Sequence, residues 1–462
     1  MLVSPYSKPE FTPYEDDEPV EGAAPIAWPA PVAGGPLSTS LSLPGSKSLT
    51  NRELVLSALA DGPSTLRSPL HSRDTALMIE ALRLLGTRIE ELPGGSPFGA
   101  DLLITPTELT GSVSIDCGLA GTVMRFIPPV AALALGPVAF DGDEAARRRP
   151  MRAAIDSLRA LGVDVTDDGH GTLPFSLYGT GEVAGGRVQI DASASSQFVS
   201  ALLLAGARFG NGLELVHSGA VLPSLAHIEM TIEVLAARGV VVERPKPGVW
   251  IVPPGPIAAR EVMIEPDLSN AGPFLAAALV AGGSVTVTGW PQRTTQVGDE
   301  FATILERMGA TVERAPDSLT VTGTGEVHGI RLADASELAP TIAAIAAFGD
   351  SETVLTGIGH LRGHETDRLA ALATELNALG GDVTETANGL VIHPAPLHGG
   401  LWHAYGDHRI ATAGAIIGLV VPDVEIDDIA STAKTLPQFP ELWAGMLGHS
   451  PRAADPIGLG LL

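Results

Sequence analysis

The sequence predicts an α/β protein made of six copies of one strand-and-helix unit, three copies in each of two domains. Two observations predict this. A helix-like segment ends in glycine about every 70 residues, six times along the chain. A short strand-like segment runs into a polar elbow, and the elbow opens an apolar helix, again six times. Regular spacing over 462 residues indicates repetition of one supersecondary unit.

The helices that end in glycine are expected at residues 74–85, 151–161, 228–238, 300–308, 367–379 and 440–447. The glycines that follow them are Gly86, Gly162, Gly239, Gly309, Gly380 and Gly448. Glycine is favoured just beyond a helix end because it adopts the left-handed conformation without a steric cost. β-branched or alternating stretches follow the first five helices, for example at 163–165, 240–243 and 310–313, and predict strands there.

The strands that lead into elbows are expected at residues 40–44, 113–116, 188–191, 262–265, 330–334 and 402–405. The repeated unit is therefore strand, helix, strand, helix, strand, strand, or βαβαββ. The last copy stops after its second helix. We expect a strand from the N-terminal end of the chain to complete it.

Three units in each domain divide the chain into residues 44–264, with units one to three, and residues 36–43 plus 265–450, with units four to six. The chain then crosses between the domains near Leu43 and near Ile264, which forms a two-strand hinge and permits closure over a ligand. Residues 1–35 are rich in proline and acidic residues and are expected to be disordered, and residues 451–462 form a loose tail.

The composition restricts the function. A formal net charge of −25 argues against nucleic acid or an anionic membrane surface as a partner. Apolar runs such as 127–140 and 272–283 are shorter than the roughly 20 residues of a membrane-spanning helix, and no signal peptide opens the chain, so a cytoplasmic protein is expected. The single cysteine, Cys117, excludes a disulfide framework and is expected to be a small buried residue. No oligomerisation signal is evident, and a monomer is expected.

The elbows carry the chemistry. Helix N-termini attract anions, although Ser, Asp and Gly also occur there as ordinary caps. A cation in the first helical turn is unfavourable to the helix dipole unless an anion is bound. In the first elbow, Lys47 stands at the helix entrance, and Ser48 and Arg52 share one helix face. This pattern predicts a phosphate or carboxylate cradle that is not a P-loop, because the Gly-x4-Gly-Lys spacing is absent.

The segment Pro-Gly-Ser-Lys-Ser-x-x-Asn-Arg at residues 44–52 resembles the opening motif of the 5-enolpyruvylshikimate-3-phosphate synthase family. Further motifs follow in family order: AGTVMR at 120–125, RRP at 148–150, SSQF at 195–198, ETDR at 365–368, DHR at 407–409 and TAKT at 432–435. The resemblance covers about residues 36–448. It implies the enolpyruvyl transferase fold, an inverse α/β barrel with two domains of three βαβαββ units, in agreement with the repeats.

The resemblance also implies the reaction. The family transfers the enolpyruvyl group of phosphoenolpyruvate to the 5-hydroxyl of shikimate 3-phosphate, by addition and elimination through a tetrahedral intermediate, and releases phosphate on the route to chorismate and the aromatic amino acids. A transferase (3-phosphoshikimate 1-carboxyvinyltransferase) is therefore expected. No metal or organic cofactor is implied, and the partners are the two small substrates.

The site residues come from the matching motifs. The residues implied for phosphoenolpyruvate are Lys47, Gly121, Arg149, Gln197, Arg368, Arg409 and Lys434. Those implied for shikimate 3-phosphate are Lys47, Ser48, Arg52, Ser195, Ser196, Gln197, Ser224, Glu337 and His364. The catalytic residues implied are Lys47, Glu365 as proton donor to carbon, and Glu337 as proton acceptor from the hydroxyl. Ser224 could equally be a plain helix cap, and His408 could assist proton transfer or orient Arg409.

Several positions depart from the family pattern. Glu337 replaces an Asp, His364 replaces a Lys, and His360 stands in place of an Asn. The residues after Ser224 are Leu-Ala-His instead of Lys-Pro-Tyr, and Leu119 and Phe126 also differ. A histidine at 364 is expected to lose its charge above about pH 6.5 and to weaken substrate binding there. With Gly121 present, sensitivity to glyphosate is expected, because an added side chain would crowd the space that the inhibitor needs.

Three alternatives were weighed. The enolpyruvyl transferase that acts on UDP-N-acetylglucosamine carries a catalytic Cys five residues before the motif arginine, where this chain has Ala120. Cys117 lies eight residues before Arg125 instead. A catalytically dead anion-binding protein is disfavoured because no acid, base or cation is replaced by an aliphatic residue. A purely structural repeat array is disfavoured by the cations at the helix entrances.

Overall fold

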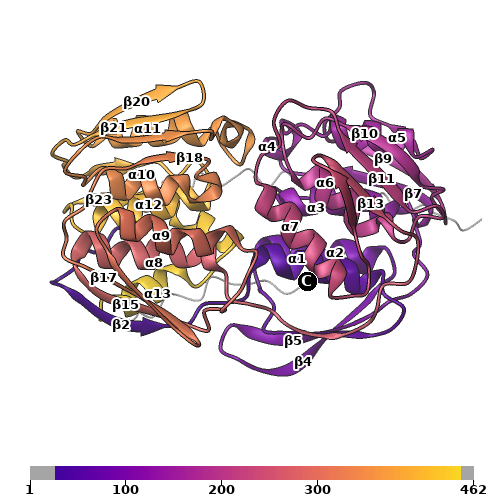
Figure 1. Cartoon of the computed structure of the whole chain (residues 1–462), viewed down its shortest axis with the longest axis horizontal. Coiled ribbons are helices and arrows are strands. Elements are labelled where there is room, and N and C mark those ends of the chain that lie inside the picture. The colour runs from indigo at the N-terminus through magenta and orange to yellow at the C-terminus, as the bar shows by residue number, and fades with distance from the viewer. Residues whose placement is uncertain (1–26, 449–462) are drawn as a thin grey trace, which may run out of the picture.

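A computed structural model of the chain describes residues 27–448. Two lobes lie side by side in Figure 1. The buried apolar side chains form two clusters, one drawn from residues 54–257 and the other from residues 30–43 and 268–446. We call residues 44–264 the N-lobe, and residues 27–43 with 265–448 the C-lobe. The segments expected to be disordered at 1–26 and loose at 451–462 lie outside the described residues.

The N-lobe contains three four-stranded sheets, in the strand orders β14-β3-β5-β4, β6-β7-β9-β8 and β10-β11-β13-β12. Its strands are β3 (Ser64–Arg67), β4 (Arg88–Ser96), β5 (Gly99–Thr105), β6 (Val113–Asp116), β7 (Leu135–Asp141), β8 (Asp164–Thr166), β9 (Phe175–Thr180), β10 (Gly186–Ile190), β11 (Leu213–His217), β12 (Glu243–Lys246), β13 (Val249–Val252) and β14 (Glu261–Met263). Its helices are α1 (Lys47–Ala58), α2 (Arg73–Leu84), α3 (Gly121–Ala131), α4 (Glu144–Arg147), α5 (Arg152–Ala160), α6 (Gln197–Gly206) and α7 (Leu225–Ala236).

The C-lobe contains the sheets β16-β17-β15-β2 and β18-β19-β21-β20, and the three-stranded sheet β1-β23-β22. Its strands are β1 (Trp28–Pro29), β2 (Leu37–Leu41), β15 (Gly283–Thr288), β16 (Thr311–Ala315), β17 (Ser318–Gly323), β18 (Arg331–Ala333), β19 (Thr353–Thr356), β20 (Asp382–Thr386), β21 (Gly389–His393), β22 (Gly400–Trp402) and β23 (Val424–Ile426). Its helices, including the short 3-10 helices labelled η, are α8 (Leu268–Ala281), η1 (Val297–Asp299), α9 (Glu300–Arg307), η2 (Ser336–Leu338), α10 (Ala339–Ala346), η3 (Gly359–Gly363), α11 (Arg368–Ala378), α12 (His408–Gly418), η4 (Ile429–Lys434) and α13 (Phe439–Met446).

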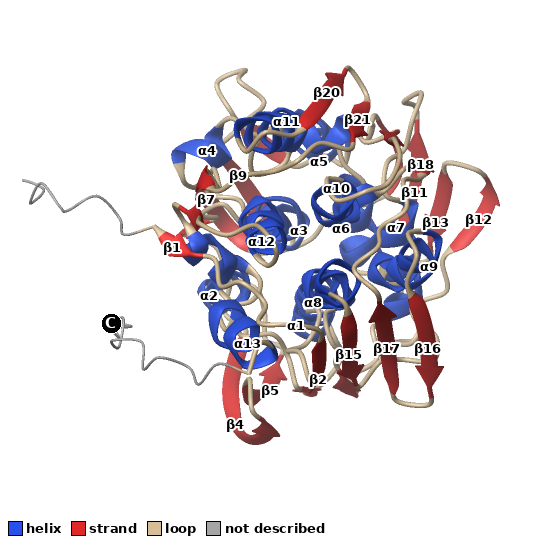
Figure 2. Cartoon of the chain, turned by 90° about the vertical axis from the view of Figure 1, so that its left-hand side faces the viewer, coloured by secondary structure: helices blue, strands red, loops and turns tan. Residues whose placement is uncertain are grey.

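Each four-stranded sheet has one parallel pair followed by two antiparallel pairs; for example, β6 pairs parallel with β7, β7 antiparallel with β9, and β8 antiparallel with β9. Figure 2 shows the sheets at the outside of the molecule and helices such as α3, α8, α10 and α12 in its interior. The chain is therefore a mixed α/β fold in which sheets enclose buried helices. No helix within residues 27–448 has both the length and the apolarity needed to cross a membrane.

The glycine ends of the repeats are confirmed. All six predicted cap glycines have positive φ angles, from 73° at Gly448 to 108° at Gly309. The predicted limits differ by three residues at four elements. Strand β2 begins at Leu37 instead of residue 40, and β22 ends at Trp402 instead of residue 405. Helix α7 begins at Leu225 instead of residue 228, and β12 begins at Glu243 instead of residue 240. Val240 and Val242 are buried in the core of the N-lobe, so their β-branched side chains serve packing and not strand pairing.

The first strands of two units are exchanged between the lobes, and β2 pairs within the fourth unit instead of completing the sixth. Strand β2 leads into α1 of the N-lobe but pairs parallel with β15 of the C-lobe. Strand β14 leads toward α8 of the C-lobe but pairs parallel with β3 of the N-lobe. The strand that joins the incomplete last unit is β1, because Trp28 pairs with Ile426 of β23.

The pairing of β1 corrects the expectation that the whole of residues 1–35 is disordered. The amide of Ala30 donates to the carbonyl of Val424 at 2.9 Å, and the amide of Ala33 donates to Leu419 at 2.8 Å. Ala30 is also buried. Residues 27–35 thus belong to the C-lobe because sheet hydrogen bonds, which composition does not reveal, hold them there.

The two crossings between the lobes lie against each other. The amide of Ser46 donates to Glu265 at 2.7 Å, and the amide of Asp267 donates to Pro44 at 2.9 Å. Gly45 stands where a side chain would not fit, since a Cβ there would lie 2.3 Å from the carbonyl oxygen of Ser68. The elbow that carries Lys47 is therefore part of the crossing between the lobes.

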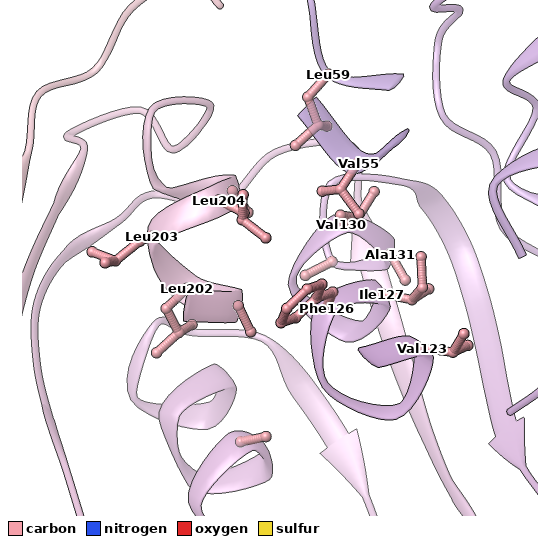
Figure 3. Close-up of a cluster of buried hydrophobic side chains, with 14 of the residues drawn as sticks. Val55, Leu59, Val123, Phe126, Ile127, Val130, Ala131, Leu202, Leu203 and Leu204 are labelled. Atoms are coloured by element: carbon pink, nitrogen blue, oxygen red, sulfur yellow. The ribbon is translucent and has the colours of Figure 1, made fainter. Parts of the chain in front are cut away.

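The core of the N-lobe positions its elbows. Figure 3 shows Val55 of α1, Phe126 and Val130 of α3 and Leu204 of α6 in one apolar cluster. Burying a side chain of this size contributes about 1.5–3 kcal/mol. Because α1, α3 and α6 are packed together in this way, their N-terminal residues are held in fixed relative positions.

Candidate active site

A cleft between the lobes is lined by the first turns of helices from both sides. Elbow residues before or within α1, α3 and α6 line it from the N-lobe, and those of α8, η2 and α12 line it from the C-lobe. Each such turn exposes backbone N–H groups and the positive end of a helix dipole. All six predicted elbows thus meet at one cleft, which favours bound anions.

The predicted site residues come together in this cleft. Those that line it are Lys47, Ser48, Arg52, Gly121, Arg149, Ser195, Ser196, Gln197, Ser224, Glu337, His364, Glu365, Arg368 and Arg409. Lys434 lies directly behind the lining, with its Nζ 2.6 Å from Oε1 of Glu365. Within the described residues, no group of three or more His, Cys, Asp or Glu side chains is arranged to hold a metal ion.

Lys47 is the first residue of α1, after the cap Ser46. Its backbone amide donates to Oδ2 of Asp267 at 3.0 Å, and its Nζ lies 3.6 Å from Oδ2 of Asp74. Asp74 is fully buried, and neither of its carboxylate oxygens accepts a hydrogen bond. A buried carboxylate is costly without a cation nearby, so Asp74 holds the ammonium of Lys47 beside the cleft. The sequence analysis missed Asp74, although its place in the first turn of α2 was visible.

Arg52 is buried and fixed from several sides. Its Nε donates to Thr231 at 2.8 Å, and its Nη2 donates to the carbonyl of His227 at 2.9 Å. Its Nη1 donates to the carbonyl of Ser48 at 2.9 Å. Burial lowers the pKa of Arg52 to about 9, although the nearby charge of Glu337 opposes this shift. The guanidinium is thus preorganised at the N-lobe wall and remains charged at neutral pH.

Gly121, Arg149 and Gln197 form one corner of the cleft. A Cβ at Gly121 would lie 3.2 Å from both Nη2 of Arg149 and Oε1 of Gln197. In the described structure, Oε1 of Gln197 has no hydrogen-bond partner although it is buried. The guanidinium of Arg149 is also buried, and within residues 27–448 only the carbonyl of Leu119 accepts from it, at 3.3 Å. Buried polar groups with so few partners mark a place where a polar ligand fits.

Glu365 lies among cations. Its Oε1 accepts from Nζ of Lys434 at 2.6 Å, and its Oε2 accepts from Nη2 of Arg368 at 2.9 Å. Burial by itself would raise the pKa of Glu365, but Lys434, Arg368 and Arg149 outweigh it and hold the pKa well below its ordinary value. Without a ligand, Glu365 is therefore a carboxylate and not an acid.

Arg368 links this cluster to the last elbow. Its Nε and Nη2 donate to the two oxygens of Asp407, at 2.8 and 3.1 Å. Burial tends to lower the pKa of Arg368, but Asp407 and Glu365 raise it above its ordinary value. Asp407 also caps α12 by accepting from the amide of Arg409 at 2.8 Å. One carboxylate therefore orients two of the predicted cations.

Glu337 belongs to η2 of the C-lobe, the same lobe as Glu365. Its Oε1 accepts from Ser269 and from Nη2 of Arg409, the latter at 3.2 Å. Its Oε2 lies 3.3 Å from Nε2 of His227, across the cleft. Burial alone would raise the pKa of Glu337, but His227, Arg409 and Ser269 hold it well below its ordinary value. The sequence analysis missed His227 and Ser269, since each lies beside a chosen residue but carried no motif of its own.

His364 does not titrate as expected from the sequence. Its Nδ1 accepts from Nη1 of Arg368 at 3.3 Å, which requires that this nitrogen carries no proton. Burial and the charge of Arg368 lower the pKa of His364 well below 6.5. The expected loss of charge near pH 6.5 is therefore wrong for the ligand-free protein, because the ring is already neutral there. Burial also lowers the pKa of the neighbouring His360.

Three further residues concern points raised by the sequence. Ser224 precedes α7 but makes no capping hydrogen bond, and its Oγ lies 3.0 Å from Oγ of Ser336 in the other lobe. It is not a plain cap. His408 is buried, and its Nδ1 has no hydrogen-bond partner. Cys117 is buried as expected, and burial raises the pKa of its thiol to about 12, so it is not a thiolate at neutral pH.

The fold and the cleft together define a two-lobed protein whose cleft collects cations from both lobes and two carboxylates, Glu337 and Glu365, an arrangement typical of an enzyme that acts on small anionic molecules. The comparisons with known proteins agree. A family model described as EPSP synthase (3-phosphoshikimate 1-carboxyvinyltransferase) matches residues 32–443. The chain belongs to this family, and it is an enzyme of the transferase class.

Individual relatives support the assignment. The 3-phosphoshikimate 1-carboxyvinyltransferase of Kocuria rhizophila is 58% identical over 430 residues, which are 91% of this chain and 96% of that protein. A solved structure of EPSP synthase from Acinetobacter baumannii matches with a TM-score of 0.73 at 24% identity, over 92% of this chain and 98% of that one. A second structure of EPSP synthase from the same organism matches with a TM-score of 0.71 at 25% identity, over 90% and 97%.

Proposed function

We propose that this enzyme transfers the enolpyruvyl group of phosphoenolpyruvate to the 5-hydroxyl of shikimate 3-phosphate and releases phosphate, as a step toward chorismate and the aromatic amino acids. One observation supports this most: cations from both lobes converge on a single cleft that also contains two carboxylates, Glu337 and Glu365. Two substrates that carry phosphate and carboxylate groups need such cations. These cations can attract anions locally although the net charge of the chain is −25, because salt screens charges that lie more than about 8 Å away.

The corner at Gly121 suits phosphoenolpyruvate. In our proposal Lys47, Gly121, Arg149, Gln197 and Lys434 receive its phosphate. Arg368 and Arg409 receive its carboxylate, since guanidinium groups bind carboxylates through two parallel hydrogen bonds. The free polar atoms of Arg149 and Gln197 support this choice.

The wall formed by α1, α6 and α7 suits shikimate 3-phosphate, a polyol with one phosphate. Hydroxyl and amide groups dominate there, together with the fixed guanidinium of Arg52. The residues proposed to bind it are Lys47, Ser48, Arg52, Ser195, Ser196, Gln197, Ser224, Glu337 and His364. A neutral His364 would act on this substrate as a hydrogen-bond donor through Nε2, not as a charge.

The proton transfers are assigned to the two carboxylates. In the addition step Glu337 accepts the proton of the 5-hydroxyl while the hydroxyl oxygen bonds to C2 of phosphoenolpyruvate. Glu365 delivers a proton to C3 in the same step. In the elimination step the Glu365 carboxylate takes a proton back from C3, and the bond from C2 to the phosphate oxygen breaks, so that phosphate leaves with the bonding electrons and takes up the proton that Glu337 releases. A base must lie within hydrogen-bond reach of its proton, and both carboxylates line the cleft.

Glu365 can donate a proton only if its pKa rises when substrate binds. The cations that depress its pKa, Lys434, Arg368 and Arg149, are the same ones proposed to bind phosphoenolpyruvate. A bound phosphate and carboxylate would offset their charge and shift the pKa of Glu365 upward. Substrate binding would thus convert Glu365 from an ionised partner of Lys434 into a general acid.

The architecture proposed for each lobe is an inverse α/β barrel of three βαβαββ units. The strand order shared by the four-stranded sheets and the interior helices support this. The reaction as proposed requires no metal or organic cofactor. A monomeric, cytoplasmic enzyme remains the expectation from the sequence.

Phosphate release tests the proposal. The protein should release phosphate from phosphoenolpyruvate when shikimate 3-phosphate is supplied. Turnover with UDP-N-acetylglucosamine and none with shikimate 3-phosphate would contradict it. Lys47→Ala should lose at least about 100-fold in kcat/KM while its circular dichroism spectrum is retained. Lys246→Ala, on the exposed strand β12, is the matched control and should behave as the wild type.

A further inference from the structure

His227 stands in the first turn of α7, on the N-lobe side of the cleft. Its Nε2 lies 3.3 Å from Oε2 of Glu337, which belongs to η2 of the C-lobe. The imidazole is largely buried, with 14% of the side chain exposed. The pair therefore spans the cleft and joins the two lobes at the proposed proton acceptor.

The two oxygens of Glu337 are held by different lobes. Ser269 of α8 and Arg409 of α12 donate to Oε1, and both belong to the C-lobe. Only His227 approaches Oε2 among the hydrogen-bond and ion-pair partners in the described residues. The C-lobe alone thus fixes one oxygen, and the second oxygen is fixed only when α7 lies against η2.

We propose that His227 is the positioning residue for Glu337: it holds Oε2 across the cleft, so that the proton-accepting carboxylate takes its working orientation only when the lobes are together. This rests on the proposed function, in which Glu337 accepts the proton of the 5-hydroxyl. A carboxylate fixed through both oxygens loses little orientational freedom when it accepts a proton, which is how preorganised groups contribute to catalysis.

The neighbouring serines show that α7 docks on η2 at a defined position. Oγ of Ser224 lies 3.0 Å from Oγ of Ser336, one residue before Glu337. Ser224 and Ser336 have φ angles of 52° and 47°. Left-handed backbone at a residue other than glycine is unfavourable and persists where the surroundings impose it. Two such residues meet here from opposite lobes.

The backbone of His227 is also fixed. Its carbonyl accepts from Nη2 of Arg52 and from the hydroxyl of Thr231, both at 2.9 Å. The backbone of His227 is therefore fixed to Arg52 of the N-lobe, while its ring faces Glu337 of the C-lobe. Movement of α7 would disturb both the proposed binding site for shikimate 3-phosphate and the orientation of Glu337.

Charged and polar groups from five helices act on Glu337. They are His227 of α7, Ser269 of α8, Arg409 of α12, Arg52 of α1 and Arg368 of α11. Burial raises the pKa of Glu337, and His227 is the first of the neighbours that lower it. Removal of the imidazole should therefore raise the pKa of Glu337. A base with a raised pKa is protonated, and thus inactive, up to a higher pH.

The experiment compares His227→Leu, which removes the ring nitrogens, with His227→Gln, whose amide nitrogen can reach the place of Nε2. For His227→Leu we expect kcat to fall at least about tenfold and the KM for phosphoenolpyruvate to change less than about twofold. The acidic limb of its kcat/KM profile should move to higher pH. His227→Gln should recover most of kcat.

His328→Leu is the matched control, because His328 forms an exposed pair with Asp350 at 2.7 Å in the C-lobe and should not matter for turnover. An unchanged acidic limb and near-normal kcat in His227→Leu would overturn the inference. Equal impairment of His227→Gln and His227→Leu would overturn it too, since the role would then be packing. If the Leu variant does not fold, the Gln variant tests the inference alone. An acidic limb that does not shift, together with a kcat reduced tenfold, would then overturn the inference.

Glu337→Gln separates the inference from the function on which it rests. Normal turnover in Glu337→Gln would refute the proposed role of Glu337 and with it the need for His227. Lost turnover in Glu337→Gln, with normal behaviour of both His227 variants, would refute only the inference. Lost turnover in Glu337→Gln with the predicted split between the His227 variants would support both.

Discussion

A buried ion pair ties α1 to Arg238, two residues beyond the end of α7, and its loss should destabilise the N-lobe. Nε and Nη2 of Arg238 donate to Oε2 of Glu53 at 2.8 and 2.7 Å. The side chains of Arg238 and Glu53 are 0% and 4% exposed. Arg238 also donates to Ser57 at 2.8 Å and to the carbonyl of Ala258 at 3.0 Å. The helices that carry Lys47 and His227 into the cleft are thus joined behind it.

Glu53→Gln keeps the shape of the side chain but removes its charge, so that the guanidinium of Arg238 stays buried without a counter-charge. Breaking one half of a buried pair costs about 3–5 kcal/mol. For a lobe of this size, that lowers the midpoint of thermal unfolding by about 6–20 °C. Arg244 and Glu229 provide the matched control, because they form a pair of the same chemistry at 2.6 Å with side chains 50% and 47% exposed.

Glu229→Gln should cost only about 0.2–1 kcal/mol, since solvent screens an exposed pair. Scanning calorimetry of the wild type and the two variants measures the difference. The reasoning is refuted if Glu53→Gln unfolds within about 2 °C of Glu229→Gln. It is also refuted if 1 M salt, which screens exposed pairs, removes most of the destabilisation.

Two further predictions concern the cleft. Because the ring of His364 is already neutral, the affinity for shikimate 3-phosphate should change with pH in the same way in the wild type and in His364→Lys between about pH 7 and 8.5, and the Lys variant should bind more tightly throughout. If the wild-type affinity falls in this range and that of the variant does not, His364 titrates there and the prediction is refuted. Gly121→Ala would place a methyl group 3.2 Å from Arg149 and Gln197. We expect this crowding to weaken phosphoenolpyruvate binding by about 1 kcal/mol or more, which is measured as a KM raised about fivefold, and to weaken inhibition by glyphosate. An unchanged KM and unchanged inhibition would contradict the crowding.

The repeats made much of the fold predictable. A glycine that must adopt positive φ after a helix is a local requirement, and so it is visible in the sequence at Gly86 or Gly309 as well as in the structure. The strand at Val113–Asp116 was predicted to the residue, because β-branched alternation between turn signals is also local. The elbows at Lys47 and Arg409 were found for the same reason.

Pairing between distant segments was not predictable in this way. The count of units assigned residues 36–43 to the C-lobe, but no feature of residues 37–41 indicates that their partner is β15. Residues 27–35 contain two prolines, like the proline-rich segment before them. Their hydrogen bonds to β23 come from the far end of the chain.

The sequence by itself determined the family, the six helix entrances and the residues that supply cations and carboxylates, since these depend on residue types in local motifs. Only the tertiary structure decided the electrostatic state of those residues. His364 is neutral because it accepts from Arg368, and Glu365 is ionised because it lies between Lys434 and Arg368. Asp74 and His227 acquire their importance through a buried or cross-lobe neighbour far away in the chain. Charge and burial depend on distances through space, and the order of residues along the chain does not contain them.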